Sequence, residues 1–135
     1  MGNDAGKMKE FGERYAAAWC SQDAASVAAF FSPTGWLSVN GGAAAMGQIA
    51  IAEVAQSFMT AFPDMRVAMD ELRELGDRTE FHWTLSGTNN GPGGTGKRVR
   101  ICGFESWKIG EDGRIASSEG QFDDAEYQRQ LREGA

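Results

Sequence analysis

The stretch that decides the fold is "RICGFESWKI", residues 100–109. Side chains of a β-strand point alternately to the two faces of a sheet. Ile101, Gly103, Glu105, Trp107 and Ile109 therefore share one face, which is the more apolar of the two and yet carries a carboxylate at its centre. Burying an unpaired acid is costly. Glu105 is therefore either a functional group in a pocket or a structural group with a hydrogen-bond partner.

The stretches around residues 100–109 carry the same alternation and predict an antiparallel sheet. Residues 77–88, "DRTEFHWTLSGT", and residues 115–122 read as strands, and "GEDG" is the turn before the last of them. Residues 65–75 read as a strand whose alternation slips near Asp70. The glycine-rich "GPGGTG" lacks the spacing of a phosphate loop and lies between two strands, so it is interpreted as a hairpin loop.

The first half of the chain has helical periodicity instead. Helices are predicted at about 7–21, 23–31 and 48–62, the second with Asp23 as its N-cap and the third with Ile49, Val54, Phe58 and Phe62 as its apolar residues. "SPTG" breaks the chain, residues 36–40 form a short strand, and "GGAAAMG" is a loop. A short last helix begins near Asp123.

Helices followed by antiparallel strands predict one α+β domain over residues 1–135, with the helices packed on one face of a curved sheet. A strongly bent sheet leaves a cone-shaped hollow on its concave side, where a small molecule can bind.

Composition limits the partners and the compartment. A net charge of −6 argues against nucleic acid or an anionic membrane as a partner. No apolar run reaches the roughly 18 residues of a membrane span, and residues 1–10 lack a secretory apolar segment. Cys20 and Cys102 form neither a disulfide framework nor a metal-ligand pattern, so we expect a cytoplasmic protein with reduced thiols.

Several short motifs resemble a known family. The chain is similar to the SnoaL-like polyketide cyclases of the nuclear transport factor 2-like superfamily, and its first half also resembles ketosteroid isomerase. The resemblance spans nearly the whole chain and implies their cone-shaped fold, a homodimer through the outer sheet face, and no metal or nucleotide cofactor. The matching residues are Gly87-Thr88, Thr95-Gly96-Lys97, Trp107-Lys108, Asp112-Gly113-Arg114-Ile115, Asp123 and Gln130-Leu131.

The resemblance implies a role for each of a few positions. The oxyanion-hole tyrosine of the isomerase maps onto Tyr15 in "ERYAAAW", and its neutral acid maps onto Glu105. The isomerase's general base falls near Val39 or Asn40, neither of which can abstract a proton. The cyclases' histidine maps again onto Glu105, and their aspartate falls on Gly120, which has no side chain.

The candidate catalytic residues are Glu105, Tyr15 and Asp123. Desolvation would raise the pKa of Glu105, so that it donates a hydrogen bond or serves as a general acid or base. Tyr15 is alternatively a core aromatic residue. Asp123 is alternatively the N-cap of the last helix, in a capping box with Glu126.

The predicted pocket has aromatic walls that suit a planar, ring-containing ligand, although an aromatic core without a cavity is the alternative. Alternation places His82, the only histidine, on the outer face, which excludes it from catalysis and makes a zinc site or a serine-histidine-aspartate triad implausible. The predicted lining residues are Trp19, Trp36, Asn40, Phe58, Trp83, Leu85, Ile101, Trp107, Ser118 and Phe122.

The sequence thus predicts a small-molecule-binding protein that performs acid/base chemistry on a hydrophobic carbonyl compound by cyclisation, isomerisation, dehydration or hydrolysis. The alternative is a non-catalytic ligand-binding or dimerisation domain of the same fold, favoured by Asn40 and Gly120. A protein-transport adaptor would instead need an exposed apolar patch at the rim of the cone.

Overall fold

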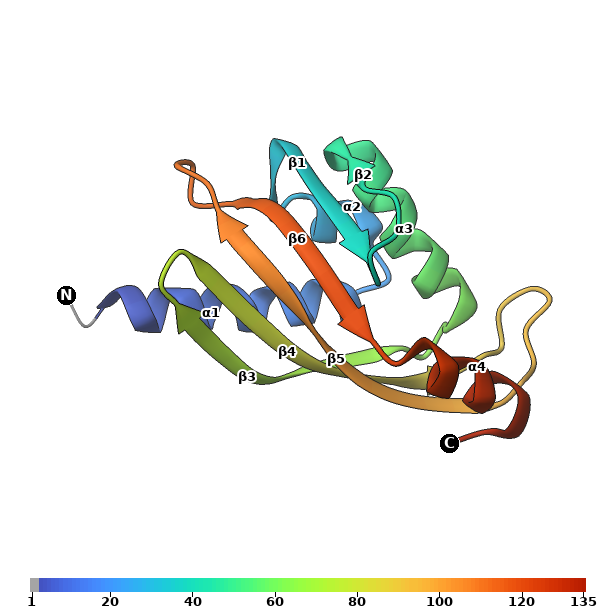
Figure 1. Ribbon diagram of the computed structural model, residues 1–135. Helices are drawn as coiled ribbons and strands as arrows, with labels where there is room; N and C mark the ends of the chain where they lie inside the picture. The colour runs from blue at the N-terminus through green and yellow to red at the C-terminus, as the bar shows by residue number, and fades with distance from the viewer. Residues whose placement is uncertain (1–2) are drawn as a thin grey trace.

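The computed structural model describes the backbone of residues 3–135 and the side chains from residue 6 onward. Within this range, helices and strands follow one another in the order that the sequence predicts, helices mainly first and strands afterwards (Figure 1). The elements are α1 (Asn3–Cys20), α2 (Ala24–Ala28), β1 (Phe31–Val39), β2 (Ala45–Met46), α3 (Gly47–Ala61), β3 (Arg66–Leu75), β4 (Arg78–Thr88), β5 (Arg98–Ile109), β6 (Ile115–Phe122) and α4 (Asp124–Glu133).

The strands of the described chain form one six-stranded sheet in the order β2-β1-β6-β5-β4-β3. Neighbours are antiparallel except β1 and β6, which run parallel. The long strands bend strongly, and α1 crosses behind them (Figure 1). The predicted α+β class with a curved, mostly antiparallel sheet is confirmed.

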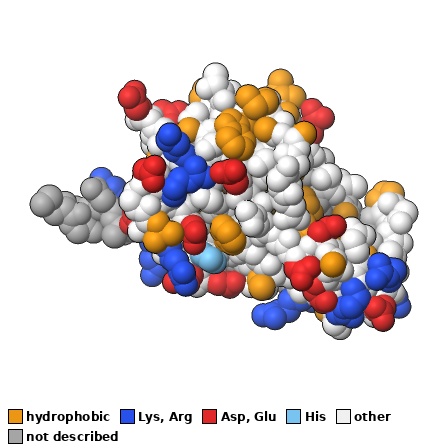
Figure 2. Space-filling view, viewed as in Figure 1, with side chains coloured by type: hydrophobic (Ala, Val, Ile, Leu, Met, Phe, Trp, Pro, Cys, Tyr) orange, Lys and Arg blue, Asp and Glu red, His pale blue; other side chains and the backbone are white. Residues whose placement is uncertain are grey.

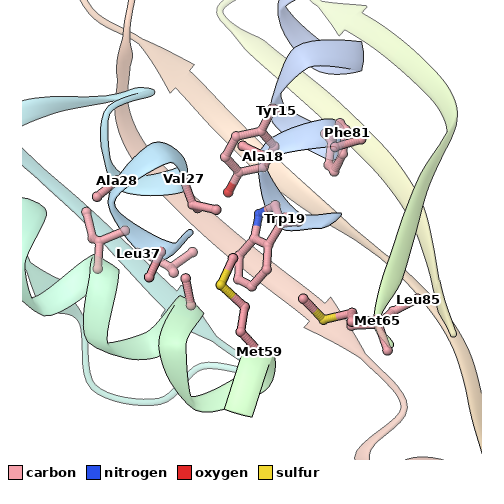
Figure 3. Close-up of a cluster of buried hydrophobic side chains, with 14 of the residues drawn as sticks. Tyr15, Ala18, Trp19, Val27, Ala28, Leu37, Met59, Met65, Phe81 and Leu85 are labelled. Atoms are coloured by element: carbon pink, nitrogen blue, oxygen red, sulfur yellow. The ribbon is translucent and has the colours of Figure 1, made fainter. Parts of the chain in front are cut away.

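The core lies between the sheet and the helices α1, α2 and α3. Helix α1 buries Tyr15 and Trp19 against Phe81 of β4, and α3 brings Met59 to the same cluster (Figure 3). Each fully buried aromatic side chain removes a large apolar area from water, so this cluster supplies much of the driving force for folding.

One register shift and one glycine shape this inner face. The register of β3 against β4 shifts between Met69 and Glu71, which confirms the irregularity expected near Asp70. On β5, a Cβ atom at Gly103 would lie only 2.7 Å from Cζ2 of Trp83. The glycine therefore lets the Trp83 indole lie directly against the backbone between Ile101 and Glu105.

Four local predictions were wrong. Residues 32–35, expected as a break, belong to β1, where a register shift between Phe31 and Trp36 accommodates Pro33 as a bulge does. The predicted loop at 41–47 contains β2, and the second helix ends at Ala28. Ile49 is 82% exposed instead of packed, because the buried face of α3 runs through Ile51, Ala55 and Met59.

Within the described residues, none of the helices has the length and apolarity required to cross a lipid bilayer.

Candidate functional site

Glu105 points to the inner face of the sheet and is 7% exposed. It lies on β5 between two long neighbours, opposite Phe81 of β4 and Gly120 of β6. The apolar face of "RICGFESWKI" is therefore the face that packs against the helices. Because side chains alternate along the strand, the Glu105 carboxylate points into the interior.

Three neutral groups donate hydrogen bonds to the Glu105 carboxyl, and we call Tyr15, Trp107 and Ser118 the donor cluster. The Ser118 hydroxyl donates to Oε1 over 2.7 Å, the Tyr15 hydroxyl over 2.9 Å, and Nε1 of Trp107 over 3.0 Å. Oε2 lies 3.2 Å from the same Tyr15 hydroxyl and receives no other bond from the described residues. Oε1 is thus nearly saturated, and Oε2 is the oxygen left to carry a proton or meet a ligand.

Two opposing effects set the acidity of Glu105. Burial raises its pKa above the usual value of 4.5, because the ionised form loses its hydration. The hydrogen bonds from Trp107, Ser118 and Tyr15 lower the pKa and offset part of that rise. The balance is a raised pKa, which keeps the neutral acid accessible closer to neutral pH than in a solvated glutamate.

Tyr15 contacts Glu105 from helix α1. Its side chain is fully buried in α1, and burial together with the negative charge of Glu105 raises the pKa of its hydroxyl well above the ordinary value. The indole nitrogen of Trp19 faces this hydroxyl (Figure 3). It makes no hydrogen bond of acceptable geometry, and Nε1 is the one buried side-chain polar atom of residues 6–135 without a partner.

A cavity of about 60 Å³ opens beside Glu105. It is smaller than the roughly 150 Å³ cavity that holds a benzene molecule. A ring-sized ligand therefore requires its walls to move, and Phe58, Trp83 and Phe122 are only half-buried. The cavity is lined by Trp19, Leu37, Val39, Val54, Phe58, Val67, Phe81, Trp83, Leu85, Ile101, Glu105, Gly120, Gln121 and Phe122.

The predicted lining residues divide into two groups. Trp19, Phe58, Trp83, Leu85, Ile101 and Phe122 line the cavity. Four other predicted residues lie elsewhere: Trp107 and Ser118 are fully buried in the donor cluster, Trp36 is half-buried on β1, and Asn40 is exposed.

Asp123 and Asn40 have structural roles in this fold. The Asp123 side chain accepts a hydrogen bond from the Glu126 backbone N–H and caps α4, as the alternative interpretation expected. Asn40 accepts from the backbone N–H of Phe122 over 2.9 Å and has a left-handed φ of 51°. Neither side chain reaches the cavity, because both are fixed at the exposed ends of their strands.

Sequence reasoning missed several lining residues, most of them apolar. The missed ones are Leu37, Val39, Val54, Val67, Phe81, Gly120 and Gln121. A usable signal existed for Phe81, which alternates with Trp83 and Leu85 on one face of β4. Val54 precedes Phe58 by one turn of the predicted third helix, so its facing was also readable. No such signal existed for Val67, since its facing depends on how β3 packs across the fold.

His82 lies on the outer face, as alternation predicted. It hydrogen-bonds to Glu80 over 2.9 Å and stacks on Phe104, with ring centroids 5.3 Å apart. Among the described residues, no group of three histidine, cysteine, aspartate or glutamate side chains is arranged to hold a metal ion.

Comparison with known families identifies the family of the chain. The model of the SnoaL-like polyketide cyclase family matches residues 9–131, so the chain belongs to that family. A comparison with curated proteins finds no match.

Solved structures confirm the fold. A hypothetical protein with a ketosteroid isomerase-like fold from Catenulispora acidiphila, solved in complex with trimethylamine, is 15% identical with a TM-score of 0.80, over 90% of this chain and 92% of that one. TsrD from Streptomyces laurentii is 23% identical with a TM-score of 0.78, over 92% and 93%. The epoxide hydrolase/cyclase-like enzyme SalBIII, with a role in pyran ring formation in salinomycin, is 20% identical with a TM-score of 0.76, over 91% and 95%.

Proposed function

We propose that this protein is an enzyme that binds a hydrophobic carbonyl compound in the cavity and uses Glu105 to transfer a proton to or from it. The observation that carries the proposal is a buried carboxyl, held by three donors at one oxygen, that lines an otherwise largely apolar cavity. Such a group has a fixed orientation and a raised pKa, which are the properties of a general acid or base.

Among residues 6–135, Glu105 is the only acid that lines the cavity, so one residue would have to both donate and accept the proton. In an aldol-type cyclisation, neutral Glu105 would donate its proton from Oε2 to the acceptor carbonyl while the enol carbon forms the new bond. The resulting carboxylate would then recover a proton from the enol hydroxyl, so that the acid is regenerated. Tyr15, Trp107 and Ser118 stabilise the charged intermediate form through the hydrogen bonds they already make.

Non-catalytic ligand binding is the second candidate. Gly120 lies opposite Glu105 in the sheet, at the position where the family resemblance implies an aspartate. Asn40 is engaged by the backbone of Phe122 and is remote from the cavity. These two positions favour a protein that binds the same class of ligand without turning it over.

Deuterium exchange separates the two candidates. Indan-1-one in D₂O is the probe, because acid/base catalysis by Glu105 would exchange its α-protons faster than buffer does. We expect Glu105→Gln to reduce the exchange rate to that of buffer while indanone affinity changes less than threefold. Glu119→Gln, on the outer face, is the matched control and should keep the full rate. Binding of indanone without accelerated exchange in the wild-type protein would establish the non-catalytic candidate.

We also propose that the chain forms a homodimer through the outer face of the sheet. Acidic and basic side chains are intermingled on this face, with the histidine among them (Figure 2). His82 and Phe104 stack near the centre of the β4–β5 pair and offer a small apolar contact.

A further inference from the structure

When Glu105 is ionised, its negative charge has no cationic partner within the described residues. Its hydrogen-bond partners are two hydroxyls and one indole N–H, and all three are neutral. The Trp107 indole can only donate, so the carboxyl oxygen that it contacts acts as an acceptor. Donors of this kind stabilise the anion but leave its charge in place, and buried charges in proteins are normally paired.

The cavity walls do not provide that pairing charge. Among residues 6–135, the lining contains Glu105 and no lysine, arginine or histidine. The cationic side chains that flank Glu105 on the same strand, Arg100 and Lys108, alternate to the outer face and are exposed. Arg78 of β4 lies on that face too and binds Glu119 over 2.8 Å. A cation beside Glu105 would therefore have to enter with a ligand.

Aromatic side chains form a large part of the remaining wall. Trp19 and Phe58 meet nearly perpendicularly, with centroids 6.2 Å apart and an interplanar angle of 72°. Trp83 and Phe122 meet at 63° and 6.1 Å, and Phe81 completes the set. Ring faces attract cations, and groups of aromatic side chains form the cages in which proteins hold quaternary ammonium ligands.

We propose that the cavity binds an organic ammonium compound whose cationic nitrogen pairs with the carboxylate of Glu105 and whose apolar part lies among Trp19, Phe58, Trp83 and Phe122. This ligand class goes beyond the neutral carbonyl compound of the proposed function. The two classes use different protonation states of one group, because a carbonyl oxygen accepts a proton from the neutral acid and an ammonium ion pairs with the anion.

Proton release is a consequence of this pairing. When an ammonium ion binds to protein in which Glu105 is neutral, one proton leaves the carboxyl for solvent and total charge is conserved. Tyr15 is the only other titratable side chain in contact with Glu105 among the described residues, and it keeps its proton because burial and the Glu105 charge raise its pKa. The net charge of −6 also favours approach of a cation over an anion.

Benzylammonium and benzyl alcohol test the proposal, because they share a ring and a number of non-hydrogen atoms and differ in charge. We expect wild-type protein at pH 8 and constant ionic strength to bind benzylammonium at least tenfold more tightly in NMR titrations. Glu105→Gln should abolish this preference and change benzyl alcohol affinity less than threefold. Glu119→Gln removes the same charge from the outer face and should preserve the preference.

A second measurement needs only the wild-type protein. The ¹³C resonance of the Glu105 carboxyl carbon, followed at a pH where the group is partly protonated, should move toward its ionised position when benzylammonium is added. Benzyl alcohol should leave it in place or move it toward the neutral position. This measurement remains decisive if Glu105→Gln fails to fold.

Each contrary outcome is distinguishable. If benzyl alcohol binds and benzylammonium binds no more tightly, the ammonium proposal is overturned while the carbonyl proposal stands. A preference that survives in Glu105→Gln and disappears in Glu119→Gln would assign the cation to the outer face and also overturn it. If neither compound binds, the cavity does not admit a ring and the ammonium proposal fails; the exchange rate of indanone then decides the proposed function separately.

Discussion

Acidic side chains have opposite surroundings on the two faces of the sheet. On the outer face, Glu119 and Glu80 are exposed or half-buried and pair with Arg78 and His82. On the inner face, Glu105 is buried and has only neutral donors around it. Water screens the outer pairs, which contribute little to stability, whereas the inner carboxyl depends entirely on its fixed surroundings. Glu105 is therefore the acid whose pKa the fold can shift.

The largest contrast between the faces is in packing. Trp107→Ala should lower the free energy of unfolding by about 3–5 kcal/mol, because it empties a fully buried site and removes a donor to Glu105. Phe104→Ala, on the outer face of the same strand, should cost only about 1 kcal/mol. Urea denaturation of both variants measures the difference, and similar costs would contradict the assignment of the two faces.

Removal of one hydroxyl from the donor cluster should have an intermediate effect. Ser118→Ala deletes the 2.7 Å hydrogen bond to Oε1 and should cost about 1.5–3 kcal/mol when Glu105 is ionised, with a further rise in the pKa of Glu105. Ser106→Ala, which loses a contact with Arg78 on the outer face, is the control and should cost less than about 0.5 kcal/mol. Carboxyl NMR titration should show no rise in the pKa of Glu105 in this control.

The pH dependence of stability should have opposite signs for a buried and an exposed glutamate. The folded-state pKa of Glu105 is raised, so its contribution is fully present below pH 4.5 and is lost as pH rises through the folded-state pKa. Wild-type protein should therefore lose stability relative to Glu105→Gln as pH rises from 4 to 8.

Glu126 on α4 is the exposed counterpart. Hydrogen bonds from Arg129 and Gln130 lower its pKa to about 2, so its contribution is present above pH 4.5 and is lost as pH falls toward 2. Wild-type protein should lose stability relative to Glu126→Gln in that acid range. Parallel pH profiles for Glu105→Gln and Glu126→Gln would show that burial does not control the acidity of Glu105.

The two buried indoles, Trp107 on β5 and Trp19 on α1, provide a smaller contrast. Trp107 donates to Glu105, whereas Nε1 of Trp19 has no partner. Trp19→Phe removes an unsatisfied buried N–H, which offsets the loss of ring volume, so it should cost less than Trp107→Phe by about 1–2 kcal/mol. Thermal melts of the two variants measure this, and a larger cost for Trp19→Phe would mean that its N–H is paired in solution.

The smallest effect on the folded chain is expected at the proposed dimer surface. Phe104→Glu should leave the secondary structure and the core unchanged but place two like charges face to face across a two-fold axis. Light scattering after size-exclusion chromatography should then show a monomer where the wild-type protein shows a dimer. A monomeric wild-type protein would refute the dimer proposal without affecting the cavity.

The sequence by itself determined the class of fold and the facing of the central strand. The period-two pattern of residues 100–109 places Glu105 and Trp107 inward, and alternation in residues 77–88 places His82 outward. These conclusions follow because side-chain direction in a strand is set by the backbone, independently of what packs against it. The irregularity near Asp70 was readable for the same reason.

Only the tertiary structure decided which inward residues reach the cavity. Trp107 and Trp83 share a face in the paired strands. Trp107 donates a hydrogen bond to Glu105 and does not line the cavity, whereas Trp83 does. Val67 lines the cavity, Asn40 does not, and Asp123 caps α4, because these positions depend on how β3 and α4 pack against the sheet. A periodic sequence specifies direction along one element, whereas depth within a core depends on contacts between elements far apart in the chain.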